Sequence, residues 1–292
     1  MSERFSRQEA FFGVVGQEKI VATRVAVVGI GGLGTHVVQQ LAYLGIRKFA
    51  LIDDEELDAT NLNRYVGARF DDPIPGTRKL SIGRRIIESV CDDSDIELID
   101  DSIVSQAAFN AVKRVDFVFG CLDNDGARLV LNELTSAYDV PYVDLATDIL
   151  TEGELQYGGR VIVTVNRPGC IVCLGQLDVR ESALDLSDPH RRCERERLYG
   201  ISADALSGTG PSVVSINGLI ASLAVTEFMV HVTGIRKSNR VLTYRGTSGV
   251  VTKSLDEPTE CFSCSQLGHK GKSDVERYIR NGVLPSRHKV VH

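Results

Sequence analysis

A glycine-rich turn between a strand and a helix is the feature that most constrains this chain. Residues 24–29 (RVAVVG) form a β-branched apolar run, and residues 35–44 place apolar side chains at helical spacing. The turn between them carries four glycines in the GxGxxG pattern: Gly29, Gly31, Gly32 and Gly34. Backbone amides at the start of such a helix can hold a phosphate group, so the sequence predicts a nucleotide site. Glycines that serve only to let the turn pack closely are the alternative.

The order of the elements predicts the fold class. Apolar runs at residues 48–53, 96–99, 115–119 and 140–145 indicate further strands, and residues 79–90, 105–112 and 127–138 indicate helices between them. This alternation is typical of an α/β fold with a Rossmann-like, doubly wound and mostly parallel sheet. After about Leu150 the chain changes to β-rich segments around one long apolar helix, which predicts an antiparallel extension of the sheet.

Composition and charge argue against several classes of protein. The chain has 292 residues, 43% of them hydrophobic, which is enough for a sizeable core. Its formal net charge of -6 comes from acids and bases mixed along the chain, which argues against nucleic acid as a partner. The N-terminus lacks the apolar run of a signal peptide, so we expect a cytoplasmic protein. Residues 211–232 include Glu227 and His231 and are too polar for a membrane span; we expect a buried helix at a subunit interface.

The cysteines indicate a metal site. Seven cysteines in a cytoplasmic chain are not expected to form a disulfide framework. Four of them occur as two CxxC pairs: Cys170, Cys173, Cys261 and Cys264. Four thiolates complete the tetrahedral shell of a zinc ion and leave no open position, so the predicted zinc is structural. Two unrelated reduced pairs, or a redox dithiol, are the alternatives.

Polar residues beyond the glycine loop bear on which nucleotide binds. Asp53 ends the next strand, where a carboxylate accepts hydrogen bonds from ribose hydroxyls. The same fingerprint serves dinucleotides, so an NAD-dependent oxidoreductase is one hypothesis. A triphosphate under attack needs cations and a carboxylate that holds Mg²⁺. The sequence places suitable groups at the carboxyl edge of the sheet: Asn61, Arg64, Lys79, Asp123 and Asn124. Taken singly, Arg64 could form a surface ion pair and Asp123 could cap a helix.

These motifs also occur in a recognisable order. The chain carries RFSRQ at residues 4–8, the GIGGLG loop, LIDDEELDATNLNR at residues 51–64, Lys79, CLDN at residues 121–124, and the two CxxC pairs. In this order and spacing they resemble the ThiF/MoeB/HesA family of ubiquitin-activating-enzyme-like (E1-like) adenylating proteins. The resemblance covers the chain from Arg4 to Cys264.

The resemblance implies an ATP-dependent adenylyltransferase that activates the C-terminal glycine carboxylate of a ubiquitin-like or sulfur-carrier protein and releases pyrophosphate. It implies that Arg7 reaches the ATP phosphates of the partner subunit in a homodimer, and that Asp123 holds Mg²⁺. The implied ATP ligands are the four glycines with Asp53, Asn61, Arg64, Lys79, Asp123 and Asn124. A peptide or tRNA-base carboxylate as substrate, and a zinc scaffold without turnover, are the alternatives.

The implied catalysis is mainly charge neutralisation. A carboxylate with a pKa of about 3.5 is ionised at neutral pH, so its attack on the α-phosphate needs no general base. Arg7, Arg64 and Lys79 would offset charge on the phosphates together with Mg²⁺ on Asp123. Cys193 lies in the run RRCER, where guanidinium groups favour a thiolate. The resemblance makes it the candidate nucleophile that takes the acyl group as a thioester for a downstream acceptor; an ordinary cysteine in a charged loop is the alternative.

We therefore expect one adenylation domain over residues 1–268. Residues 1–150 would form the nucleotide-binding half, and residues 151–268 would hold the antiparallel extension, a crossover segment and the zinc. Residues 269–292 would form a C-terminal tail.

Overall fold

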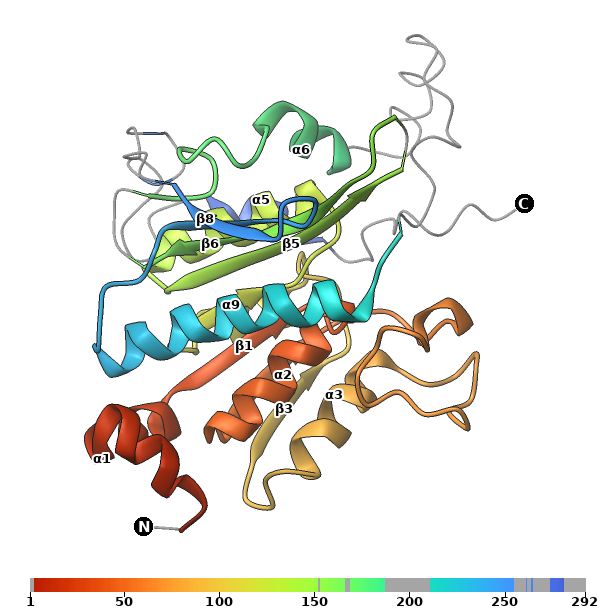
Figure 1. Cartoon of the computed structure of the whole chain (residues 1–292). Coiled ribbons are helices and arrows are strands. Elements are labelled where there is room, and N and C mark those ends of the chain that lie inside the picture. The colour runs from red at the N-terminus through yellow and green to blue at the C-terminus, as the bar shows by residue number, and fades with distance from the viewer. Residues whose placement is uncertain are drawn as a thin grey trace, which may run out of the picture.

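The computed structural model describes residues 3–151, 153–165, 169–186, 211–254, 261, 264 and 274–280. Its described part contains an eight-stranded sheet in the order β3-β2-β1-β4-β5-β6-β7-β8 (Figure 1). The strands are β1 (Arg24–Val28), β2 (Lys48–Ile52), β3 (Asp95–Ile99), β4 (Phe117–Gly120), β5 (Tyr142–Leu150), β6 (Gln156–Thr164), β7 (Val241–Arg245) and β8 (Val250–Lys253). The helices are α1 (Ser6–Ala22), α2 (Gly32–Leu44), α3 (Lys79–Glu88), α4 (Gln106–Val112), α5 (Asp125–Tyr138), α6 (Val179–Asp185) and α9 (Val214–Thr233), with short 3-10 turns η1 (Glu3–Phe5), η2 (Ala59–Asn61) and η4 (Val275–Tyr278).

The sheet confirms the predicted fold class. Strands β1 to β5 pair in parallel, and β6, β7 and β8 continue the sheet from β5 with antiparallel pairing. The chain runs outward from β1 to β2 and β3, and then returns to the other side of β1 with β4. The crevice at the carboxyl ends of β1 and β4 is therefore the topological switch point, which is where sheets of this kind bind ligands.

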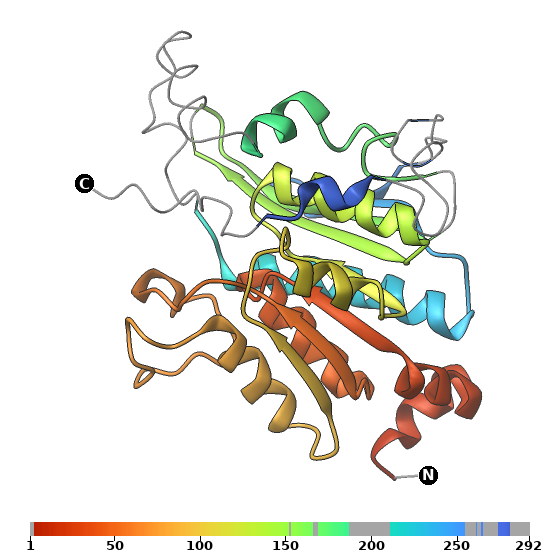
Figure 2. The same ribbon diagram turned by 180° about the vertical axis from the view of Figure 1, so that it is seen from behind.

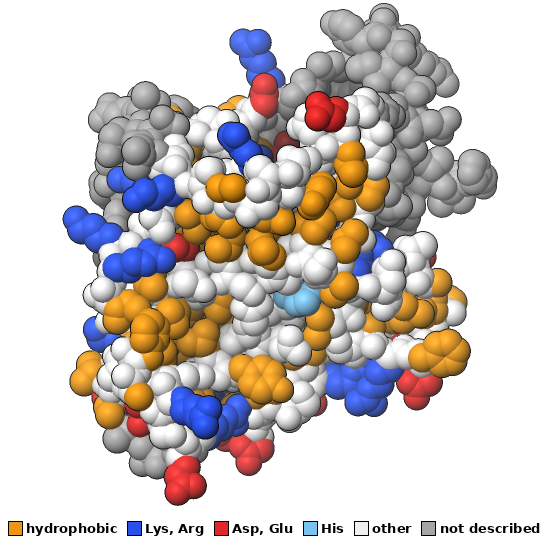
Figure 3. Space-filling view, viewed as in Figure 1, with side chains coloured by type: hydrophobic (Ala, Val, Ile, Leu, Met, Phe, Trp, Pro, Cys, Tyr) orange, Lys and Arg blue, Asp and Glu red, His pale blue; other side chains and the backbone are white. Residues whose placement is uncertain are grey.

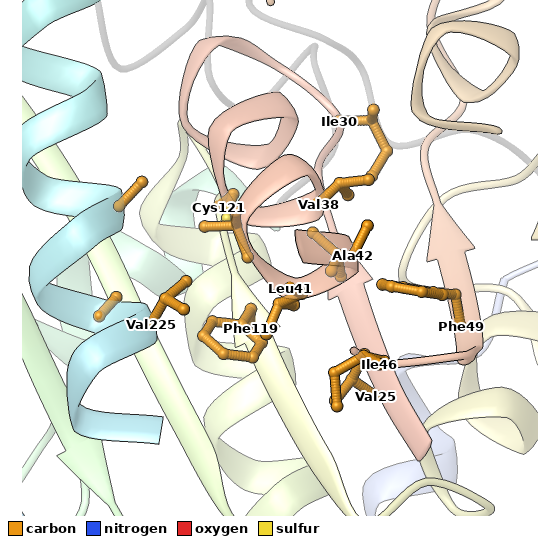
Figure 4. Packing of buried hydrophobic residues seen from close by; sticks show 14 of the residues in the cluster. Val25, Ile30, Val38, Leu41, Ala42, Ile46, Phe49, Phe119, Cys121 and Val225 are labelled. Atoms are coloured by element: carbon orange, nitrogen blue, oxygen red, sulfur yellow. The ribbon is translucent and has the colours of Figure 1, made fainter. Parts of the chain in front are cut away.

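Two apolar layers cover the two faces of the sheet because successive strand residues point to opposite sides. In β1, Val25 and Val27 join the cluster under α2, α3 and α9, while Ala26 and Val28 join the one under α4 and α5. Figures 1 and 2 show these helices on opposite faces. Figure 4 shows part of the first cluster, where Leu41 lies with residues from β4 and α9.

The sequence pattern does not predict α1. Its apolar residues have no regular helical spacing, and Gly13 interrupts the helix with a φ of 79°. Two glutamines tie the helix to the end of α2: Gln8 donates to the Tyr43 carbonyl at 3.1 Å and Gln17 to the Leu44 carbonyl at 2.9 Å. These tertiary contacts place α1 at the amino edge of the sheet, and local sequence does not reveal them.

The long apolar helix α9 packs against α1, α2, β5 and β6. Within the described residues it is the one helix long and apolar enough to span a membrane by length and composition, and 44% of its apolar window is buried inside the fold. Near the C-terminus, η4 packs on α5, and Arg277 pairs with Glu133 at 2.6 Å. Residues 274–280 of the expected tail therefore pack on α5, in the helical layer that covers the sheet.

Candidate functional site

The glycine loop leaves no room for side chains at three of its four glycines. A Cβ atom on Gly34 would lie 1.9 Å from the Gly29 carbonyl oxygen, and one on Gly29 would lie 2.5 Å from the Cys121 carbonyl oxygen. A Cβ on Gly32 would lie 2.5 Å from the Asn217 amide nitrogen of α9. Close packing alone thus explains these three glycines. The case for a nucleotide therefore depends on the groups around the loop. No side chain caps the start of α2, so its first backbone amides are available to a phosphate.

Asp53 ties the glycine loop to the end of β2. One carboxylate oxygen accepts a hydrogen bond from the Ile30 amide at 2.6 Å, and the other accepts one from the Glu55 amide at 2.9 Å. Loss of surrounding water raises the pKa of the Asp53 carboxyl to about 6, an effect that nearby Lys79 opposes. From the sequence, Asp53 is expected only to bind ribose; the structure adds a role in holding the loop.

This pKa predicts that nucleotide affinity falls in mildly acidic solution. The ionised carboxylate is the form that accepts both amide hydrogen bonds, and a raised pKa means that protons compete for it near pH 6. We expect ATP affinity to be constant above pH 7 and to weaken as the pH falls through about 6. Calorimetric titration across this range tests it. An Asp53→Asn variant, which cannot titrate, should bind more weakly throughout and lose the inflection; an unchanged inflection would assign it to another group.

Lys79 places a buried cation beside the loop. It begins α3, its residue is 7% exposed, and its ammonium donates to Glu55 and lies 5.4 Å from the centre of the Tyr65 ring. Burial alone would lower the pKa of Lys79, but Tyr65, Asp53 and Glu55 together raise it above the usual value. Lys79 therefore stays charged at neutral pH.

Tyr65 joins Lys79 to the glycine loop, a role that is not expected from the sequence motifs. A Cβ on Gly31 would lie 3.3 Å from the Tyr65 hydroxyl, so the buried ring borders the loop directly. Arg64 stacks on the same ring at 5.6 Å and donates to the Thr60 carbonyl. No carboxylate pairs with Arg64 among the described residues, so the alternative of a surface ion pair is not what the structure shows. The aromatic residue directly after Arg64 was the available signal.

Asn61 and Asn124 both act as caps. The Asn61 side-chain oxygen accepts from the Asp58 amide at 3.0 Å and closes the turn of η2. The Asn124 side-chain oxygen accepts from the Ala127 amide at 2.7 Å and caps α5. A helix cap was the alternative role for Asp123, but its neighbour Asn124 caps α5. Asp123 itself is exposed on the loop after β4. Their roles toward ATP and Mg²⁺ stay predictions.

A buried ion pair lies under the loop that carries Asp123. Arg128 donates to both Asp144 oxygens at 2.6 Å and also to the Leu122 carbonyl, while the Tyr142 hydroxyl donates to Asp144 at 2.8 Å. Arg128 and Asp144 are 5% and 0% exposed. The pair joins β5 to the Asp123 loop, and it is not among the site residues expected from the sequence. Charged residues inside the apolar runs of α5 and β5 were the signal.

Breaking this pair is expected to be costly because it leaves one charge buried alone. An Arg128→Met variant should lose about 3–5 kcal/mol of unfolding free energy, and the Arg128→Met/Asp144→Leu double variant should regain much of that loss. Urea denaturation measures both. Arg114→Met is the control, because Arg114 is 53% exposed and pairs with Glu97 at 2.6 Å; it should cost less than about 1 kcal/mol. Equal losses for Arg114 and Arg128 would contradict the argument.

Arg7 is the predicted site residue that the fold keeps away from the others. It lies exposed in α1, which contacts the far end of α2. Because α2 has 13 residues, its far end lies about 20 Å from the glycine loop. Within one chain, the structure therefore brings together the loop, Asp53, Arg64 and Lys79, but not Arg7. Cys193 lies outside the described residues.

The four predicted zinc ligands form one cluster. The sulfur atoms of Cys170, Cys173, Cys261 and Cys264 all lie within 4.8 Å of one another, with contacts of 3.4, 3.5 and 3.8 Å. A tetrahedral zinc with bonds of about 2.3 Å separates its thiolates by about 3.8 Å, so the arrangement fits the ion. The Ile171 amide beside the cluster donates to Asn132 of α5 at 3.1 Å. The cluster therefore lies beside the second half of α5, away from the glycine loop at the start of α2.

Comparisons with known proteins agree with this architecture. The chain is 26% identical over 201 residues to the sulfur carrier protein ThiS adenylyltransferase of Escherichia coli, which spans 68% of this chain and 73% of that protein. It is 29% identical over 143 residues to the SAMP-activating enzyme E1 of Haloferax volcanii, which spans 48% of this chain and 52% of that protein.

Among solved structures, E. coli MccB with ATP superimposes with a TM-score of 0.69 at 19% identity, over 91% of this chain and 75% of that one. At this identity the likeness concerns the fold. The model of the ThiF family matches residues 5–261. This range includes the glycine loop and the buried Lys79. It also includes three of the four clustered cysteines, Cys170, Cys173 and Cys261. The chain belongs to the ThiF family.

Proposed function

We propose that the protein uses ATP and Mg²⁺ to adenylate a carboxylate, with release of pyrophosphate. The observation that carries the proposal is the buried, charged Lys79 beside the glycine loop, with Asp53 and Arg64 next to it. A dinucleotide site needs the loop and the acid, whereas a departing pyrophosphate needs cations as well. The names of the relatives, an adenylyltransferase and an activating enzyme, support the same chemistry.

The residues of this chain would act by positioning and charge. Asp53 fixes the loop, so that its amides and the start of α2 face the phosphates. Lys79 and Arg64 offset charge as it moves toward the leaving pyrophosphate. Asp123 would hold Mg²⁺, which supplies further charge neutralisation when bound. The substrate carboxylate is ionised at neutral pH and needs no general base.

For the substrate, we infer the C-terminal glycine carboxylate of a ubiquitin-like or sulfur-carrier protein. The support is that relatives named for such carriers match the chain, one of them over 68% of its length. A peptide is the second candidate, because MccB, whose structure was also determined with N-formylated MccA, shares the fold at a TM-score of 0.71 and 19% identity. A tRNA-base carboxylate is the third candidate. We also propose a cytoplasmic location, because the N-terminal sequence lacks the apolar run of a signal peptide.

ATP–pyrophosphate exchange with the purified protein tests the proposal. Exchange that requires a carrier protein ending in glycine supports the first substrate, and exchange that requires only a short peptide supports the second. Nicotinamide-dinucleotide binding without ATP binding would refute adenylation and revive the oxidoreductase. Neighbouring genes that encode a small protein ending in glycine-glycine would identify the carrier to try first.

We propose a homodimer in which Arg7 reaches the ATP of the partner subunit. Apolar side chains gather on the face in Figure 3, and Phe11, Val15 and Tyr43 of α1 and α2 are 67%, 64% and 59% exposed. A mixture of Arg7→Ala and Lys79→Met proteins tests the shared site, since a mixed dimer carries both defects in one site and none in the other. Recovery of exchange on mixing supports it. If the mixture stays inactive although the two variants exchange subunits, Arg7 does not act in the partner's site.

Two further roles complete the proposal. Cys170, Cys173, Cys261 and Cys264 would hold a structural zinc. Cys193 would accept the acyl group as a thioester and pass it to a downstream acceptor; attack of the thiolate on the acyl carbon releases AMP. The product would survive acid but not a thiol reductant, and a Cys193→Ala variant that yields the same adduct would remove this role.

A further inference from the structure

Two carboxylates interact with the Lys79 charge, Glu55 through a direct ion pair and Asp53 electrostatically without one, and they differ in what else holds them. Asp53 uses both of its oxygens to accept backbone amide hydrogen bonds, from Ile30 and from the residue two positions on. The Glu55 carboxylate accepts from Lys79 alone among the described residues. Asp53 is therefore fixed as part of the loop, and Glu55 is held in place chiefly by Lys79.

The two partners of the ion pair also differ in exposure. The Lys79 side chain is 9% exposed, whereas the Glu55 side chain is 31% exposed. The ammonium is buried beside the Tyr65 ring, but the glutamate reaches solvent and can turn into it. When a second anion approaches Lys79, the partner that can leave is Glu55.

We propose that Glu55 competes with nucleotide phosphate for the Lys79 ammonium and so sets the affinity for ATP. This inference rests on the proposed function, because it assumes that Lys79 meets the phosphates of ATP. Glu55 holds the buried ammonium charged and oriented, and it must give up this contact when the triphosphate takes its place. Glu55 is thus a positioning residue that stabilises the site and weakens ATP binding.

A Glu55→Gln variant tests the competition because it keeps the length of the side chain and removes its charge. We expect it to bind a non-hydrolysable ATP analogue with Mg²⁺ about tenfold more tightly than the wild type, which corresponds to about 1.4 kcal/mol. Adenosine, which has no phosphate, should bind both proteins equally. Isothermal titration calorimetry measures all four affinities.

Glu56→Gln is the matched control. Glu56 is the next residue, and its carboxylate lies 3.8 Å from Arg78 rather than at Lys79, so its loss changes the net charge equally. It should leave ATP affinity almost unchanged. A Lys79→Met background is the second control, because in it Glu55→Gln should no longer tighten binding.

Three outcomes overturn the inference. In the first, the wild type binds the analogue well but Glu55→Gln binds it no more tightly than Glu56→Gln does. This result refutes the competition and leaves the proposed adenylation intact. Tightening that persists in the Lys79→Met background assigns the effect to general repulsion. A wild-type protein that binds adenosine and the analogue equally, or binds neither, refutes the proposed function and the inference with it.

Discussion

Replacing Lys79 with methionine is expected to slow ATP–pyrophosphate exchange about a hundred- to a thousandfold. Lys79 is the buried cation of the site, and a fixed charge aimed at developing negative charge contributes about this much to a rate. Methionine keeps most of the side-chain volume, so the helix α3 that Lys79 begins should still pack. Radioactive pyrophosphate incorporation into ATP measures the rate, and adenosine affinity checks that the rest of the site is intact.

The chain offers a matched control for this variant. Lys113 also pairs with a glutamate, Glu276 at 3.1 Å, and also lies over a tyrosine ring, that of Tyr138 at 4.6 Å. It lies at the end of α4, on the other face of the sheet. Lys113→Met should leave exchange at the wild-type rate. If both variants lost the same activity, the defect would come from a lost ion pair and not from the nucleotide site.

The second large effect is expected at the cysteine cluster. A Cys170→Ser variant should lose its zinc and more than about 4 kcal/mol of unfolding free energy, because a metal that binds only the folded chain adds its binding energy to stability. Metal analysis of the purified protein and urea denaturation measure the two losses. The fraction that remains folded should still bind ATP, since the cluster lies beside the second half of α5 and away from the glycine loop.

Cys91→Ser is the control for the cluster. Cys91 is also a buried cysteine, with its sulfur 3.2 Å from an Asp93 oxygen, but it lies outside the group of four. It should keep the full zinc content. A wild-type protein that contains no zinc and unfolds at the same urea concentration with and without chelator would disprove a structural metal.

The sequence could predict the elements whose pattern is local. The alternation of apolar strands and helices was enough for the doubly wound sheet and its antiparallel extension, and the CxxC spacing was enough for the cluster. It could not predict α1, because that helix is held by glutamine contacts to the distant residues Tyr43 and Leu44.

The same limit applies to the candidate site. The GxGxxG pattern, Asp53, Arg64 and Lys79 could be found because each stands at a position that the fold class makes meaningful. The contacts that organise them could not. The Ile30 amide on Asp53 and the Glu55 carboxylate on Lys79 join segments that are far apart in sequence. The Arg128–Asp144 pair could only be suspected, since a charge within an apolar run does not name its partner.

Helix α5 holds the cysteine cluster at a fixed distance from the Asp123 loop. Asn124 caps one end beside Asp123, and the cysteines lie near Asn132 and the turns that follow it. The helix has 14 residues, so its two ends are about 20 Å apart. Cobalt(II), placed where we propose zinc, would shift nuclear magnetic resonance signals by an amount that depends on their distance and direction from it. Signals from the Asp123 loop would then report, from a fixed point outside the site, how far that loop moves when nucleotide and metal bind.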